Sequence, residues 1–251
     1  MNYYILSLAI LPVIVLAWVV YRQDRFEREP IRMLLKAFFF GAAAILPAIV
    51  LESILSAFTP QIPIVSGAYT GFVVAGCSEE LCKLLMLRWA VWRSKEFDEY
   101  FDGIVYACFV SLGFACFENI AYVFQSDSYA DALVTGSVRA LLSVPGHFLF
   151  GVMMGYYFAL AKFDQEHTSS HMLKAFLIPM LLHGTFDSLL MIPESMGSAG
   201  QIVGMGLFVV LIWFDVKMWR WGIRRIRHLQ ELSQQQDADR HNPFSGFTWN
   251  F

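Results

Sequence analysis

Apolar residues run through this chain in long stretches that short polar connections separate. Seven of these stretches are close to or above the roughly 20 residues that an α-helix needs to cross a bilayer. They lie at about 3–21, 34–57, 68–92, 101–125, 132–161, 172–192 and 199–219. The pattern predicts an all-α polytopic membrane protein with about seven transmembrane helices.

Composition supports this interpretation. Of the 251 residues, 57% are hydrophobic and 16% are charged, a balance that argues against a soluble protein. No Lys or Arg precedes the first stretch, and the segment YRQDRFEREPIR follows it. This order of charges is the reverse of that in a signal peptide. The four cysteines show no CxxC spacing, which indicates neither a disulfide framework nor a thiolate zinc site. We expect the lipid bilayer, and no nucleic acid, as a partner.

Basic residues alternate between the connections. Lys and Arg follow the first, third and seventh stretches and flank the connection between the fifth and sixth. The connections at 58–67, 126–131 and 193–198 contain none. By the positive-inside rule, this alternation predicts an N-terminus outside and a cytoplasmic C-terminus, which agrees with an odd number of spans.

The chain divides into four predicted segments. They are two N-terminal transmembrane helices (1–67), a four-helix membrane core (68–192), a last transmembrane helix with a basic anchor (193–227) and a flexible cytoplasmic tail (228–251). The anchor combines Trp219 and Trp221 with a basic cluster, which is typical of a segment at an anionic cytoplasmic leaflet. The tail is polar and low in aliphatic residues, which favours flexibility.

Ionisable residues away from the ends of a transmembrane helix indicate function, because burying them in lipid is costly. Four core stretches carry such residues, three or four apart and hence on one helix face. The motifs are EELCK (Glu79, Glu80, Lys83), FACFEN (Phe114, Glu118, Asn119), HFLFG (His147, Gly151) and HGTFD (His183, Asp187). At a rise of ~1.5 Å per residue, their ionisable groups converge in the outer half of the bilayer. The deepest, His147, follows Pro145 and Gly146, where we expect a kink or a late helix start.

This set of residues points to hydrolytic chemistry. One intramembrane His or Asn is usually a packing hydrogen bond, but three Glu, two His and one Asp exceed what packing requires. Such groups activate water either by holding zinc with an open coordination position or by acting as a general base. HExxH is absent, so the groups must come from separate helices. Lys83, one turn after Glu79, is the predicted counter-ion.

The same motifs resemble those of PrsW-type intramembrane proteases, within the superfamily that contains the type II CAAX prenyl endopeptidases. The step Asp102–Gly103 also resembles the family's opening of the second-motif helix. The similarity covers about 68–190 and implies peptide-bond hydrolysis within or just outside the membrane. The best-known substrate class is an anti-sigma factor. The matches are EExxK at Glu79, Glu80 and Lys83, FxxxE at Phe114 and Glu118, HxxxG at His147 and Gly151, and HxxxD at His183 and Asp187.

The resemblance makes Glu79, Glu80, Glu118, His147, His183 and Asp187 catalytic candidates, with Lys83, Phe114, Asn119 and Gly151 in supporting positions. We hypothesise that a water lies between Glu79 or Glu80 and Glu118, and that Asp187 fixes the tautomer of His183. In the metal version, zinc is held by Glu118, His147 and His183. In the metal-free version, His183 and Asp187 donate toward the tetrahedral oxyanion.

The predicted function is therefore that of a multi-pass intramembrane endopeptidase in a bacterial cytoplasmic membrane. It cleaves a single-span membrane protein near the outer face, as in site-1 cleavage of a regulatory protein. Two alternatives are an ion-coupled transporter and a non-catalytic assembly factor. Transporters often contain internal repeats, which this chain lacks, and a silent subunit would usually lose a motif acid or histidine, whereas this chain keeps all.

Overall fold

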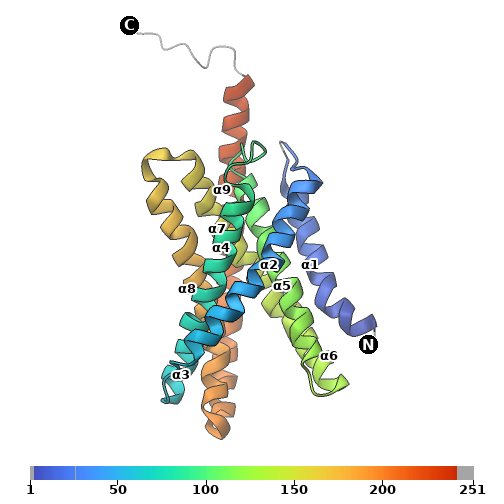
Figure 1. Ribbon diagram of the computed structural model, residues 1–251, viewed down its shortest axis with the longest axis vertical. Helices are drawn as coiled ribbons and strands as arrows, with labels where there is room; N and C mark the ends of the chain where they lie inside the picture. Colours follow the sequence, from blue (N-terminus) through green and yellow to red (C-terminus); the bar gives the residue numbers. More distant parts are fainter. Residues whose placement is uncertain (1–2, 26, 242–251) are drawn as a thin grey trace.

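The computed structural model describes residues 3–25 and 27–241, and all regular structure among them is helical (Figure 1). In order, the elements are α1 (Tyr3–Gln23), α2 (Ile31–Ser56), α3 (Pro63–Tyr69), η1 (Thr70–Cys77), α4 (Ser78–Val91), α5 (Asp102–Phe124), α6 (Tyr129–Val138), η2 (Arg139–Ser143), α7 (Val144–Phe163), η3 (Gln165–His167), α8 (Thr168–Ser195), η4 (Gly197–Ala199) and α9 (Gly200–His241). Of these, η1 and η2 are π-helical turns within longer helices.

Six helices in the described part of the chain are long and apolar enough to cross a membrane, which confirms an all-α polytopic membrane protein. They are Tyr3–Gln23, Ile31–Ser56, Asp102–Phe124, Tyr129–Phe163, Gln165–Ser195 and Gly197–Arg240. The stretch expected as a further span, 68–92, is also helical, but it is assembled from α3, η1 and α4. The charges of EELCK interrupt its apolar run, and it packs against α2 and α8.

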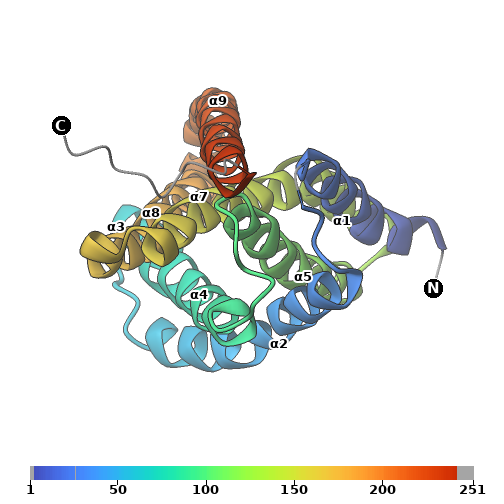
Figure 2. The same cartoon turned by 90° about the horizontal axis from the view of Figure 1, so that it is seen from above.

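The centre of the bundle is formed by α5 and α7, which pack against each other (Figure 2). In the apolar window of α5, 72% of the residues are buried, against 11% for the last helix, so α5 is surrounded by protein and α9 is not. Close packing depends on glycine, since a Cβ added to Gly155 would lie 2.3 Å from the carbonyl oxygen of Gly103. This approach explains the glycine that follows Asp102.

The connections that carry basic residues meet at one end of the molecule. Arg32 pairs with Glu96 at 3.3 Å, and Lys162 Nζ donates to the carbonyl oxygen of Trp92 at 2.8 Å. The start of α1 and the end of α9 lie toward opposite ends of the long axis (Figure 1). This arrangement agrees with the alternation of basic connections, and the orientation relative to the membrane stays a prediction.

Buried carboxylates stabilise the connections at this same end. Asp102 Oδ2 accepts hydrogen bonds from the backbone N–H groups of Asp98 (3.1 Å) and Glu99 (2.7 Å), so it fixes the turn that leads into α5. The Tyr106 hydroxyl donates to Glu29. Burial raises the pKa of Glu29 to about 8 and that of Asp24 to about 6.

The segment from residue 228 was predicted to be a flexible tail, but it is helical as far as the structure describes it. Helix α9 continues to His241, and Leu229 and Ser233 are buried. Ser233 Oγ accepts a hydrogen bond from the N–H of Phe101 at 2.9 Å. Gln236 donates to the carbonyl oxygen of Asp98 at 2.8 Å. These bonds satisfy the connection before α5, a tertiary role that polar composition does not reveal; residues 242–251 of the predicted tail lie outside the described part.

Candidate active site

The four polar motifs come together in the interior of the bundle. Glu79 and Glu80 lie on the first turn of α4, His147 on the first turn of α7 and His183 in the middle of α8. All four are buried, and each offers a ligand atom within 4.8 Å of those of the other three. The structure therefore places at one point residues that are as much as 104 positions apart in the sequence, from Glu79 to His183.

Lys83 is the centre of this cluster. Its fully buried ammonium donates to Glu79 Oε2 at 3.0 Å, Glu80 Oε1 at 2.8 Å and His147 Nδ1 at 3.0 Å. It also lies 4.1 Å from the centre of the Phe114 ring, within cation–π range. The predicted counter-ion contacts are present, and Phe114 contributes to the same cation site.

The contacts of His147 fix its tautomer. Because an ammonium only donates, Nδ1 of His147 accepts from Lys83 and the proton of a neutral ring lies on Nε2. Nε2 then donates to Glu118 Oε2 at 2.9 Å. Glu118 also pairs with Arg139 at 2.7 Å, and Arg139 Nε donates to Asn119 Oδ1 at 2.7 Å. Glu118 and Asn119 thus lie on the far side of His147 from the two glutamates of α4.

His183 lies between two carboxylates. Its Nδ1 is 2.9 Å from Glu80 Oε1, and its Nε2 is 3.3 Å from Asp187 Oδ2, one turn along α8. The ring of Phe150 stacks on the imidazole with a centroid separation of 4.7 Å. These three contacts hold the plane of the ring, which is the arrangement that a catalytic or metal-ligating histidine needs.

A cavity of about 560 Å³ adjoins the cluster. Glu79, Glu118, His147, His183 and Asp187 all line its wall, whereas Glu80 does not. The lining continues to the ends of three helices that lie away from the basic connections, at Glu52 of α2, Gln125 after α5 and Glu194 of α8. The cavity thus extends from the cluster toward the end whose connections lack basic residues.

Local backbone features position the motifs. The π-turns η1 and η2 end just before α4 and α7, which carry the glutamates and His147. Such turns are often found at functional sites. In place of the kink or late helix start expected at Pro145, the structure has the π-turn η2, and the helix continues from Tyr129 to Phe163. Pro145 is the second residue of α7, directly after η2, where the change in helical hydrogen bonding accommodates a residue without a backbone N–H.

Two motif glycines allow helices to approach closely. A Cβ on Gly151 would lie 3.0 Å from the side chain of Ser111 on α5, tighter than an ordinary contact. A Cβ on Gly184, directly after His183, would lie 2.3 Å from the Phe72 ring of η1. The glycines therefore set the distances between the helices that carry the cluster.

Arg139 and Glu52 were not among the predicted site residues. Both line the cavity, and Arg139 pairs with Glu118. The signal was available, since each is an ionisable residue inside a predicted transmembrane stretch, as the motif residues are. The stacking of Phe150 on His183 had no such signal, because phenylalanine is frequent throughout this chain.

The family model described as PrsW family intramembrane metalloprotease matches residues 29–214. The chain belongs to this family. Protease PrsW of Clostridioides difficile (strain 630) is 38% identical over 208 residues, which are 82% of this chain and 85% of that relative. Protease PrsW of Bacillus subtilis (strain 168) is 32% identical over 234 residues, 92% and 98% of the two chains. No solved structure matches.

As a PrsW-family member, the chain is an intramembrane protease. It is a multi-pass protein of a bacterial membrane. A protease in the bilayer acts on a membrane-protein substrate. Family membership therefore favours the enzyme over both alternatives, the ion-coupled transporter and the silent assembly factor.

The buried cluster fits a metal by the chemistry of its donors. Two carboxylates and two imidazoles are ligands that zinc accepts, and Glu80 Oε2 is buried without a hydrogen-bond partner among the described residues. The group differs from the predicted zinc ligands, because Glu118 is absent from it and contacts the other nitrogen of His147. The ammonium of Lys83 already contacts three of the four donors, as a cation would.

Proposed function

We propose that this protease cleaves a single-span membrane protein near the outer membrane face. The observation that carries the proposal is the cavity that joins the buried Glu/His cluster to the predicted outer ends of α2, α5 and α8. A substrate helix must unwind to present a carbonyl, which is easiest near an interface where water satisfies the freed groups. The family resemblance supports a regulatory protein such as an anti-sigma factor as the substrate class.

We assign the general base to Glu79. Its side chain lines the cavity. Of its two carboxylate oxygens, only Oε2 is hydrogen-bonded within the described part of the chain, to Lys83. Glu80 is 0% exposed and is engaged by both Lys83 and His183, so it holds the ion pair and the imidazole in place. This division gives different roles to two neighbouring glutamates that the sequence does not distinguish.

In this mechanism, a water beside Glu79 attacks the scissile carbonyl carbon while the carboxylate accepts its proton. As the oxyanion forms, His183 Nε2 exchanges its 3.3 Å contact with Asp187 for a donation toward the oxyanion, while Glu80 holds the ring through Nδ1. Glu118 orients His147 through the 2.9 Å contact to Nε2. When the intermediate collapses, the proton held by Glu79 passes to the leaving amine, so the site returns to its starting state.

We propose Glu80, His147 and His183 as the residues that would hold zinc, because three protein ligands leave one coordination position open and leave Glu79 free to act as the base. The bound zinc would supply Lewis-acid activation of water and carbonyl. Purified full-length protein should then contain about one zinc per chain by elemental analysis. His147→Ala should lower this content severalfold, whereas His167→Ala, in the exposed turn after α7, should leave it unchanged. Metal-free protein that cleaves at the full rate would assign the reaction to a glutamate-activated water alone.

The position of cleavage tests the proposed function directly. Reconstituted protease, incubated with tagged single-span membrane proteins that include an anti-sigma factor, should yield a new terminus within the outer few turns of the substrate helix or just outside it. Mass spectrometry locates this terminus, and a Glu79→Gln preparation is the control for contaminating proteases. A cut in the cytoplasmic third of the helix contradicts the proposal.

A further inference from the structure

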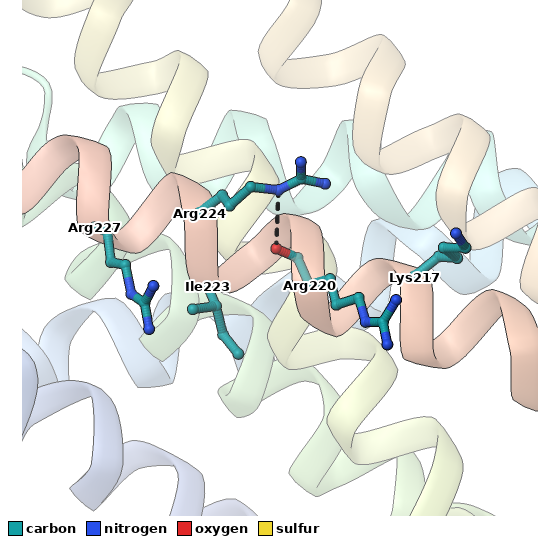
Figure 3. A pocket seen from close by; sticks show the side chains of 5 residues that line it. All are labelled: Lys217, Arg220, Ile223, Arg224 and Arg227. Carbon is teal, nitrogen blue, oxygen red and sulfur yellow. Dashed lines mark hydrogen bonds between the residues drawn. The ribbon is translucent and has the colours of Figure 1, made fainter.

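A stripe of four basic side chains lies along α9, outside the catalytic region. Lys217, Arg220, Arg224 and Arg227, together with Ile223, line a shallow surface hollow of about 500 Å³ (Figure 3). The spacing of three, four and three residues places the cations on one helix face, and all four are exposed. Arg224 Nε donates to the carbonyl oxygen of Arg220, at 3.3 Å.

These cations lack acidic partners within the described part of the chain. Elsewhere at this end, Arg32 pairs with Glu96, and Arg240 pairs with Asp98. No ion pair is formed by the four basic residues of the stripe among residues 3–25 and 27–241. The hollow therefore presents positive charge that the described protein does not neutralise.

The stripe directly continues an apolar, exposed face of α9. Val209 is 69% exposed and Trp213 is 61% exposed, and Lys217 lies 5.4 Å from the centre of the Trp213 ring. Lys217 is ~26 Å along the helix from its first residue, at ~1.5 Å per residue, close to the ~30 Å thickness of a hydrocarbon core. The cations thus begin where the apolar face ends, at the level of lipid headgroups.

We propose that this hollow binds the phosphate headgroup of an anionic phospholipid in the leaflet at the basic end of the molecule. Arginine and lysine are suited to phosphate, and the adjoining apolar face of α9 accommodates the acyl chains. A nucleic acid or an acidic soluble protein would match the charge but not the exposed apolar surface that continues from it. The combination of both features on one helix face specifies a lipid.

The test measures lipid binding to the full-length protein. Purified protein in detergent is titrated with phosphatidylglycerol or phosphatidylcholine, and native mass spectrometry counts the bound lipids. The parent should bind phosphatidylglycerol at least tenfold more tightly, since each cation near anionic lipid contributes about fivefold. The variant K217Q/R220Q/R224Q/R227Q should lose this preference.

A matched variant separates a site from general surface charge. R22Q/R25Q/R32Q/K95Q removes one lysine and three arginines from exposed positions at the same end of the molecule and should keep the preference. The charge-preserving variant R220K/R224K/R227K should also keep most of it, which excludes misfolding of α9 as the cause. Equal losses in the two glutamine variants, or no preference in the parent, overturn the proposal.

Discussion

Replacing Glu79 by glutamine is expected to lower the rate of substrate cleavage by about 10²–10⁴-fold, the usual contribution of a general base. Glutamine keeps the shape of the side chain and can still accept a hydrogen bond from Lys83, but it does not accept a proton from water. The change should therefore affect catalysis more than folding, because a neutral amide is less costly to bury than a carboxylate. Initial rates of cleavage of a tagged membrane protein measure the effect.

Glu52 provides a matched control for this substitution. It lines the same cavity, but no hydrogen bond or ion pair joins it to the cluster among the described residues. Glu52→Gln should leave the rate within a fewfold of the parent. Glu80→Gln should reduce both cleavage and thermal stability, since Glu80 supports Lys83 and His183. Cleavage at the parental rate by Glu79→Gln is incompatible with our assignment of the base.

Features that depend on local physics could be predicted from the sequence. The length of an apolar stretch and the thickness of the bilayer determine where a helix can span, and a spacing of three or four residues determines which side chains share its face. For this reason the positions of the helices, the contact of Lys83 with Glu79 and that of Asp187 with His183 could all be expected.

Features that depend on how helices pack could not be predicted in this way. The sequence shows that Glu118 and His147 both face inward, but not that Glu118 contacts the nitrogen opposite the cluster. That arrangement depends on the close approach of α5 and α7 at glycines and on the ion pair between Arg139 and Glu118. The helical end of α9 could not be predicted either, because the residues that stabilise it by hydrogen bonds lie more than 100 positions earlier in the chain.

The other large effect is expected on stability, for Lys83→Met. Methionine matches the length of the lysine side chain but removes the cation, leaving Glu79 and Glu80 without their buried counter-charge. Removing one partner of a buried ion pair typically costs about 3–5 kcal/mol, because the remaining charge stays desolvated. Thermal and denaturant unfolding in detergent should show a loss of this size, whereas Lys95→Met, at an exposed position, should change stability by no more than about 0.5 kcal/mol.

A second substitution distinguishes the loss of the counter-charge from a simple packing defect. If unpaired carboxylates cause the instability, then Lys83→Met combined with Glu80→Gln should recover part of the lost stability, because one buried charge has been removed. A packing defect at residue 83 would predict additive losses instead. Recovery of stability should not restore activity, because the ammonium also fixes His147 Nδ1 as an acceptor. An unfolding midpoint for Lys83→Met equal to that of the parent would show that the ion pair contributes little to the fold.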